Sequence, residues 1–194
     1  MTAAGAALPP VTSVALDVHE SALSAVPRFR ACIGMGGNLG DVRAHLRAAL
    51  SGLSTLPGTT LEGVSSLYQT RPVDATGPDY LNAVAVLQTA LGPRELLGAL
   101  HALEANRDRE RPYVNAPRTL DLDLLCHGDA QRSTPFVTVP HPRMTGRAFV
   151  LEPLLEALAT LPPEASAPLP PLPDAAERAT LARDQGIARL NERL

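Results

Sequence analysis

The sequence predicts one globular domain in which a mixed β-sheet carries helices on its faces, and three observations support this. Of the 194 residues, 45% are hydrophobic and 19% are charged, a balance typical of a globular protein rather than a disordered one. Short apolar runs that fit buried strands intermingle with segments whose apolar residues recur at helical spacing. The connections between them have the lengths of hairpins and of crossovers, so we expect strands and helices to share one core.

The first strand and the first helix are expected at the start of this domain. Residues 29–36 form a short apolar run closed by glycines, as a buried strand would be. A glycine-rich turn follows, and over residues 41–56 apolar side chains recur at helical spacing until a Pro-Gly pair ends the helix. Residues 1–28 have no sustained period, so we expect a poorly ordered N-terminal extension there and a single domain over 29–194.

The middle of the chain predicts two strands around a long loop, followed by a second helix. Residues 64–68 and 80–91 have the composition of strands. The ten-residue segment 70–79 between them consists of turn formers and is longer than a hairpin needs, which makes it a candidate binding loop. A helix with an apolar stripe begins at Pro93, since proline suits the first helical position.

The last third of the chain predicts one more strand and two helices. Residues 119–126 alternate as a strand does, and apolar residues recur at helical spacing over 147–158. Six prolines between residues 162 and 173 predict a stiff connector. We expect the tail from Asp174 to be helical and residues 187–190 to close on the sheet.

Composition excludes several classes of function. The 17 basic residues, all of them arginine, face 20 acidic ones, and the net charge of -3 argues against a surface built to coat nucleic acid. Without lysine the chain has neither a Walker-type phosphate loop nor a Schiff-base amine. We expect no membrane span, since no apolar run approaches ~20 residues, and no secretory signal, since Arg28 is the first arginine of the chain. The two isolated cysteines, Cys32 and Cys126, fit buried thiols in a reducing cytoplasm.

The segment 117–125 carries the strongest chemical signal. Its leucines alternate with Asp121 and Asp123, so on a strand the two carboxylates point the same way from backbone positions ~7 Å apart. Like charges this close repel unless a cation lies between them. Mg²⁺ is the natural candidate because it takes a few carboxylates together with water and substrate phosphates. The alternative is a half-exposed strand whose outer face is acidic.

Arginines gather around this segment. Where even spacing of the 17 would place between three and four in 41 residues, seven occur: Arg107, Arg109, Arg111, Arg118, Arg132, Arg143 and Arg147. Guanidinium groups fork onto phosphate oxygens, and together with metal-binding carboxylates they form the electrostatic set that phosphoryl transfer uses. A solvated loop is the alternative for the cluster alone, although the prolines near Arg111 leave no helical period for ordinary surface ion pairs.

Three further features each have a functional and a structural interpretation. Tyr80 and Asn82 share a strand face, where the Asn82 amide offers a donor and an acceptor to a heterocycle or makes a cross-strand hydrogen bond. His141 lies between two prolines and either donates to a phosphate or is an exposed turn residue. His101 and Glu104 share a helix face that either touches a nucleotide or faces solvent.

Three separated motifs resemble the 6-hydroxymethyl-7,8-dihydropterin pyrophosphokinase family of folate biosynthesis. They are Pro-Arg-Thr-Leu-Asp-Leu-Asp-Leu-Leu (117–125), Pro-Asp-Tyr-Leu-Asn (78–82) and Val-Pro-His…Arg-x-Phe-Val-Leu (139–151). The resemblance runs from about Ala31 to the C-terminus. It implies a monomeric α+β enzyme with a ferredoxin-like, mainly antiparallel sheet. Residues 29–194 would be its single catalytic domain. It also implies a reaction, in which the pyrophosphoryl group of ATP moves to the hydroxymethyl group of the dihydropterin and AMP is released.

The resemblance further implies roles for the residues at matching positions. Asp121 and Asp123 would hold two Mg²⁺ ions against the ATP phosphates. Arg109 and Arg111 would be catalytic arginines on a loop that closes over the substrates. Contacts to the nucleotide and its phosphates would come from Glu104, Arg118, Thr138, His141 and Arg147. The pterin pocket would consist of Thr70, Tyr80, Asn82 and Phe149, with Asn82 on the ring edge and the aromatic side chains on its faces.

Two other functions are compatible with parts of this pattern. A different Mg²⁺-dependent nucleotidyl or phosphoryl transferase could use the same Asp-x-Asp and would ignore pterin. A non-catalytic ferredoxin-like module could bind RNA or a regulatory metabolite. An aromatic content of 3% and a net charge of -3 count against an RNA-stacking surface.

Overall fold

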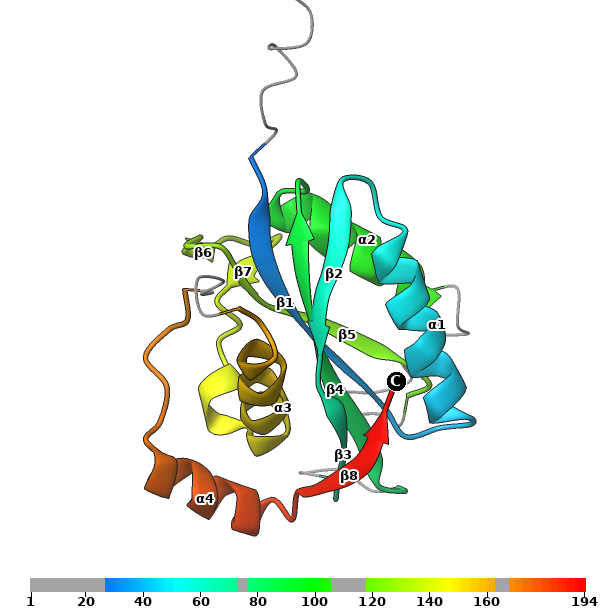
Figure 1. Ribbon diagram of the computed structural model, residues 1–194, viewed down its shortest axis with the longest axis vertical. Coiled ribbons are helices and arrows are strands. Elements are labelled where there is room, and N and C mark those ends of the chain that lie inside the picture. The colour runs from blue at the N-terminus through cyan, green and yellow to red at the C-terminus, as the bar shows by residue number, and fades with distance from the viewer. Residues whose placement is uncertain (1–26, 73–76, 106–117, 163–167) are drawn as a thin grey trace, which may run out of the picture.

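The computed structural model describes residues 27–72, 77–105, 118–162 and 168–194 (Figure 1). The first part of the described chain consists of β1 (Phe29–Gly37), α1 (Val42–Ser54), β2 (Thr59–Val64), β3 (Ser66–Thr70), β4 (Tyr80–Thr89), α2 (Pro93–Ala105) and β5 (Asp121–His127). The second part consists of β6 (Arg132–Ser133), β7 (Thr138–Val139), the 3-10 turn η1 (Met144–Gly146), α3 (Ala148–Ala159), α4 (Ala175–Asp184) and β8 (Ala188–Arg193). The predicted N-terminal extension lies outside the described residues, apart from its last two.

The main sheet has the strand order β5-β1-β4-β3-β8, and β2 also pairs with β4. Each of its pairings in the described chain is antiparallel. When β2 and β3 are counted as one interrupted strand, the order of elements from β1 to β5 is β-α-β-β-α-β, the ferredoxin-like arrangement. The expected α+β fold is therefore confirmed, with β8 added at one edge of the sheet.

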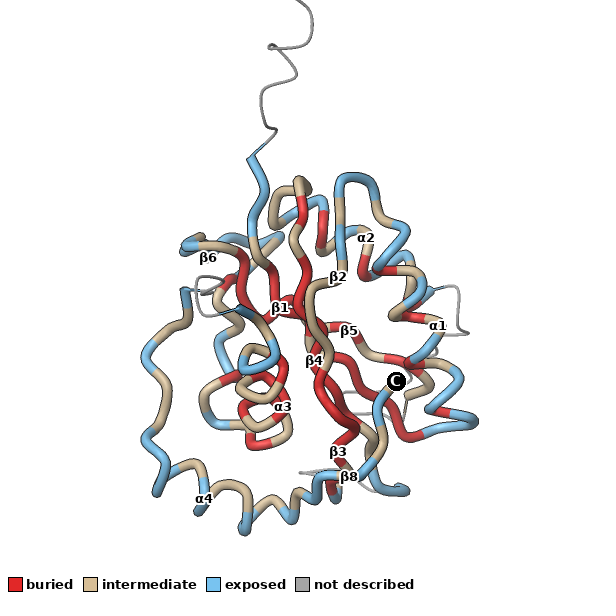
Figure 2. The backbone as a smooth tube through the Cα atoms, viewed as in Figure 1, coloured by how far each residue is buried: buried red, intermediate tan, exposed pale blue. Residues whose placement is uncertain are grey.

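Helices cover both faces of the sheet (Figure 1). The helices α1 and α2 cover one face, where Leu46 and Leu100 are fully buried in the larger core cluster. On the other face, α3 packs Val150 and Leu154 onto a second cluster with strand residues such as Val84. Burial is accordingly concentrated in the central strands (Figure 2). No helix in the described part of the chain has the length and apolarity to span a membrane.

Local sequence signals explain where the helices begin. The Asp41 side chain caps α1 by accepting a hydrogen bond from the Ala44 N–H at 3.0 Å. At the start of α2, the Glu95 carboxylate accepts from the Gly92 N–H at 2.8 Å. Asp174 and Glu177 form a reciprocal capping box at the start of α4. The predicted helices over 41–56, from Pro93, over 147–158 and from Asp174 are all present.

The predicted strand over residues 64–68 is wrong in its extent. The chain forms two strands there, β2 and β3, which meet at Ser65. Ser65 is fully buried and its hydroxyl accepts a hydrogen bond from the Val84 N–H of β4 at 3.0 Å, so the chain is held where its pairing with β4 shifts by one residue. A further shift between Leu61 and Gly63 removes the regular alternation from β2. Because of these irregularities the residues of β2 do not alternate with period two, and so the sequence does not predict this strand.

The C-terminal tail closes on the sheet as predicted. β8 pairs with β3, and Arg189 on β8 donates to the Glu156 carboxylate of α3 at 2.8 Å. Glu156 also accepts hydrogen bonds from the hydroxyls of Ser66 and Tyr68 on β3, at 2.8 and 2.7 Å. The tail, the sheet edge and α3 are thus joined by one polar cluster.

Candidate active site

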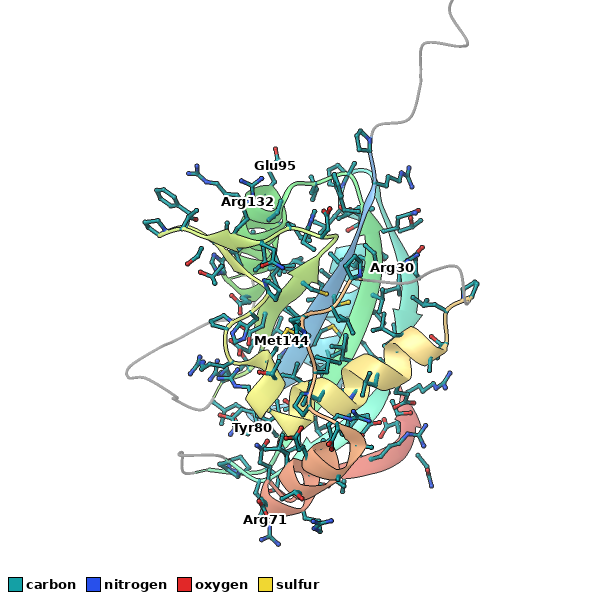
Figure 3. All side chains as sticks on the ribbon, turned by 90° about the vertical axis from the view of Figure 1, so that its left-hand side faces the viewer. Arg30, Arg71, Tyr80, Glu95, Arg132 and Met144 are labelled. Atoms are coloured by element: carbon teal, nitrogen blue, oxygen red, sulfur yellow. The ribbon has the colours of Figure 1, made fainter. Side chains whose placement is uncertain are left out.

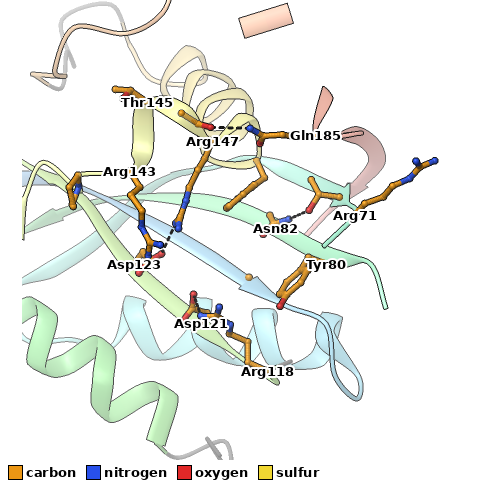
Figure 4. A pocket seen from close by; sticks show the side chains of 15 residues that line it. Arg71, Tyr80, Asn82, Arg118, Asp121, Asp123, Arg143, Thr145, Arg147 and Gln185 are labelled. Carbon is orange, nitrogen blue, oxygen red and sulfur yellow. Dashed lines mark hydrogen bonds and ion pairs between the residues drawn. The ribbon is translucent and has the colours of Figure 1, made fainter. Parts of the chain in front are cut away.

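A cavity of about 540 Å³ lies at one end of the sheet, between the strand ends and the start of α3 (Figure 4). Tyr80 and Arg71 are at this end of the molecule, whereas Glu95 is at the opposite end (Figure 3). The volume is that of an ordinary small-molecule site. The cavity brings together eight of the predicted site residues: Thr70, Tyr80, Asn82, Arg118, Asp121, Asp123, Arg147 and Phe149.

Asp121 and Asp123 point from the same face of β5 into this cavity, as the alternation predicts. The intervening Leu122 is buried in the core on the other face. The side chains of Asp121 and Asp123 are 21% and 40% exposed. Both carboxylates are thus partly exposed at the wall of a concave site.

Glycines on the neighbouring strand leave room above the two carboxylates. β1 places Gly34 opposite Asp123 and Gly36 opposite Asp121. A Cβ atom at Gly36 would lie 2.8 Å from the Asn82 side-chain oxygen, which is closer than such atoms approach in proteins. The glycine-rich end of β1 thus serves the site by having no side chain there, a role that its sequence alone did not indicate.

Arginines approach both carboxylates. The Arg118 guanidinium lies 2.7 Å from the Asp121 carboxylate, and the Arg147 guanidinium lies 3.9 Å from that of Asp123. Arg71 and Arg143 also line the cavity. With four guanidinium groups against two carboxylates, the described lining carries an excess of positive charge, which suits a polyanionic ligand such as a phosphate chain.

Two ionisable groups of the site have shifted pKa values. Burial raises the pKa of the Asp123 carboxyl, and the charge of Asp121 raises it further against the opposing effect of nearby cationic groups. Burial has the opposite effect on His141, whose pKa it lowers. The charge of Asp123 opposes this decrease, and the charge of Arg147 adds to it. Because burial and Asp121 both disfavour the charged form of Asp123, a bound cation would stabilise that form.

The donor set of the cavity fits Mg²⁺. Within the described residues, no group of three or more His, Cys, Asp and Glu side chains is arranged to hold a metal. Mg²⁺ does not need such a cage, because it keeps several waters and binds through one or two carboxylates plus substrate phosphates. Asp121 and Asp123 provide those two carboxylates at the wall of a cavity that suits an anion.

The end of the cavity next to β3 and β4 is polar at its base and aromatic at its sides. Asn82, only 7% exposed, donates from its side-chain amide to the Thr70 hydroxyl at 3.0 Å. This is the cross-strand hydrogen bond that the sequence offered as one alternative, and it also fixes the orientation of the amide in the cavity. Tyr80 and Phe149 line the same cavity from β4 and α3. A flat heterocycle with polar edges would fit these groups.

A second hollow of about 250 Å³ adjoins the first, and Asp123 and Pro142 line both. It contains the predicted nucleotide residues Thr138 and His141. At its rim, Phe136 is 65% exposed and the Arg94 guanidinium lies 4.5 Å from the centre of its ring. Asp123 therefore stands where the two hollows meet.

Among the predicted site residues that the structure describes, Glu104 alone lines neither hollow. Glu104 is 1% exposed and accepts a hydrogen bond from the Leu122 N–H at 2.8 Å, so here it ties α2 to β5. It does not face solvent, although His101, which the sequence placed on the same helix face, is exposed. Arg109 and Arg111 lie outside the described residues.

In the larger cavity, seven lining residues were not among the predicted site residues: Gly36, Arg71, Pro142, Arg143, Thr145, Gly146 and Gln185. Arg143 belongs to the arginine cluster, which is a signal that could have identified it. Arg71 lies in the loop that was a candidate binding loop. Gln185 had no signal, because it comes from the α4–β8 turn and reaches the site only in the folded chain.

Several known proteins have sequences similar to that of this chain. The family model described as 7,8-dihydro-6-hydroxymethylpterin-pyrophosphokinase matches residues 32–159. The 2-amino-4-hydroxy-6-hydroxymethyldihydropteridine pyrophosphokinase of Synechocystis sp. is 43% identical over 126 residues, which are 65% of this chain and 65% of that protein. The Pseudomonas aeruginosa protein of the same name is 43% identical over 128 residues, 66% of this chain and 79% of its own length. The Haemophilus influenzae one is 39% identical over 132 residues, 68% of this chain and 82% of its own length.

Proposed function

The chain belongs to the 7,8-dihydro-6-hydroxymethylpterin-pyrophosphokinase family, and from this premise we propose that it transfers the pyrophosphoryl group of ATP to 6-hydroxymethyl-7,8-dihydropterin in folate biosynthesis. One observation carries the proposal for this site. A single cavity is lined by the carboxylates of Asp121 and Asp123, the guanidinium groups of Arg118 and Arg147, and the Asn82 amide with its two aromatic neighbours. The enzyme is a transferase, and ATP is its co-substrate.

The reaction joins the hydroxymethyl oxygen to the β-phosphorus of ATP. The bond between the β-phosphorus and the oxygen that bridges it to the α-phosphorus breaks, AMP leaves, and the hydroxyl proton passes to solvent. A neutral hydroxyl is a poor nucleophile, so most of the rate enhancement must come from alignment and from neutralisation of developing charge. The two adjoining hollows support such an alignment, because a phosphate chain that runs past Asp123 would connect an occupant of one with an occupant of the other.

Asp121 and Asp123 are the residues that would hold Mg²⁺, and we assign two ions to them. When bound, Mg²⁺ neutralises phosphate charge and orients the phosphate oxygens. Arg118 and Arg147, already beside the carboxylates, bind the phosphate oxygens through their guanidinium groups. Arg109 and Arg111 complete the proposed catalytic set from outside the described residues.

The pterin binds between Tyr80 and Phe149, with the Asn82 amide on its polar edge. The support is the fixed amide, which Thr70 holds through a hydrogen bond at 3.0 Å. The nucleotide extends toward Thr138 and His141 in the second hollow. Glu104, which the family resemblance assigns to the nucleotide, holds the β5 backbone between Asp121 and Asp123. We further propose a monomer in the cytoplasm, which suits the free, buried thiols of Cys32 and Cys126.

The test is an assay for AMP with Mg²⁺, ATP and 6-hydroxymethyl-7,8-dihydropterin. We expect AMP that depends on both the pterin and Mg²⁺, and its loss when the metal is chelated. ADP in place of AMP would contradict pyrophosphoryl transfer. Calorimetry with the pterin separates the alternative, since another nucleotidyl or phosphoryl transferase would bind ATP and ignore the pterin. Sedimentation tests the proposed monomer.

A further inference from the structure

The first turn of α3 forms one wall of the cavity. The N-cap residue of this helix does not cap it with its own side chain. Arg147, at the N-cap position, is extended and makes no side-chain cap hydrogen bond. Its guanidinium lies 5.4 Å from the centre of the Phe149 ring, so the two side chains form one unit of the wall. The N–H groups of a first helical turn have no partner within the helix and need one from elsewhere.

Gln185 supplies that partner from a distant part of the chain. Its side-chain oxygen accepts from the Ala148 N–H at 2.9 Å, and its side-chain nitrogen donates to the Gly146 carbonyl at 2.9 Å. The second of these bonds is drawn in Figure 4. The two contacts lie on either side of Arg147 in sequence, so one amide group holds the backbone before and after it. Each polar atom of the Gln185 amide therefore has one backbone partner in the wall.

Gln185 is itself held in place. It is the C-cap residue of α4, where its N–H donates to the Leu181 carbonyl at 2.9 Å. Beyond it, β8 pairs with β3 and Arg189 is bonded to Glu156 on α3. The tail is therefore attached to α3 at its first turn through Gln185 and at its third turn through Arg189. This tail lies beyond residues 32–159, which the family model matches.

We propose that Gln185 is a positioning residue for the reaction: through Ala148 and Gly146 it fixes the first turn of α3 and thereby the placement of Arg147 and Phe149 in the cavity. The inference rests on the proposed function of the cavity. It assigns to the C-terminal tail a part in substrate alignment that is separate from its contribution to the sheet. Loss of the clamp lets the wall move away from the bound pterin, so the cost falls on kcat/KM for the pterin.

The test compares Gln185→Ala with Asp174→Ala. Asp174→Ala removes the capping box at the other end of α4 but leaves both contacts of Gln185, so it is the matched control for general loosening of the tail. Loss of one helix cap is expected to change occupancy of the capped state about fivefold. We expect Gln185→Ala to lower kcat/KM for the pterin by about this factor or more, and Asp174→Ala to change it less than twofold.

A double-mutant cycle with Phe149→Leu tests the route. If Gln185 acts partly through Phe149, Gln185→Ala should lower kcat/KM by a smaller factor in the Phe149→Leu background than in the wild type, because only the Arg147 part of its effect is left. Equal losses in Gln185→Ala and Asp174→Ala, or a loss that persists in full beside Phe149→Leu, would overturn the inference.

Hydrogen exchange separates the inference from the proposed function. The amides of the first turn of α3 should exchange faster in Gln185→Ala than in Asp174→Ala, whatever the reaction. Unchanged exchange would overturn the clamp even in an active enzyme. Wild-type protein that forms no pterin-dependent AMP would instead contradict the proposed function, and the exchange measurement would still test the clamp.

Discussion

Asp121 on β5 lies directly opposite Gly36 on β1. Gly36 is in turn opposite Asn82 on β4, so a residue without a side chain separates the carboxylate from the buried amide. This arrangement keeps the floor of the cavity open across three strands. Position 36 must therefore be glycine, which is unusual within a strand, because any side chain there would enter the site.

Gly36→Ala should weaken pterin binding. The new Cβ would lie 2.8 Å from the Asn82 side-chain oxygen, so the amide must move away from its hydrogen bond with Thr70. We expect KM for the pterin to rise about tenfold, the effect of about one misplaced buried hydrogen bond. The matched control is Gly34→Ala on the same strand face, whose Cβ would meet Leu125 at an ordinary 3.4 Å. Equal KM values in the two variants would contradict the proposed position of the pterin.

Asp121→Asn and Asp123→Asn should each lower kcat by about a hundredfold or more, because a displaced metal removes charge stabilisation from the transition state. AMP formation at saturating substrate measures the effect. Asp129→Asn is the control, since Asp129 is exposed and lies on neither hollow. Near-normal turnover of either cavity variant would rule out the proposed two-carboxylate role.

Phe149→Ala and Phe136→Ala should affect different substrates. Phe149 lines the larger hollow beside Asn82, whereas Phe136 lines the smaller one with Thr138. We expect Phe149→Ala to raise KM for the pterin about tenfold and to leave KM for ATP within about twofold. Phe136→Ala should show the opposite pattern in the same initial-rate measurements. Parallel effects of both variants on both substrates would refute the division of the site into these two hollows.

Glu156 should make the fold sensitive to acid. The hydrogen bonds from Arg189, Tyr68 and Ser66 lower its pKa from 4.5 to about 2. A carboxyl whose pKa is lower in the folded state stabilises the protein above the unfolded-state value, and this contribution is lost as pH falls from about 4.5 to about 2. Solvent around Arg189, which is 48% exposed, weakens this interaction. We therefore expect the contribution of Glu156 to the free energy of unfolding to be about 1–2 kcal/mol.

Urea unfolding at pH 6 and pH 3 measures this contribution. Glu156→Gln should reduce the difference in unfolding free energy between the two pH values. Glu152→Gln, which removes a looser ion pair of 3.8 Å with Arg178, should leave most of that difference in place. An unchanged pH dependence in Glu156→Gln would show that the stabilisation comes from other groups.

The parts of the fold that follow from neighbouring residues were predictable. The helices have apolar stripes and local caps such as Asp41, and β1 has a continuous apolar run that ends at glycines. The orientation of Asp121 and Asp123 follows from the period of a strand, whatever that strand pairs with. β2 was missed because its pairing with β4 is irregular, so its residues do not alternate regularly between the two faces.

The larger outline of the reaction was also present in the sequence, since the Asp-x-Asp segment, the arginine cluster and the three motifs lie in continuous stretches of chain. The tertiary structure decided which of these groups meet and what holds them. Gly36 is needed because β4 places Asn82 opposite it, and Gln185 reaches α3 because β8 returns to β3. Such contacts join residues 37 or more positions apart, and only the folded arrangement of strands and helices determines them, because no local period relates one partner to the other.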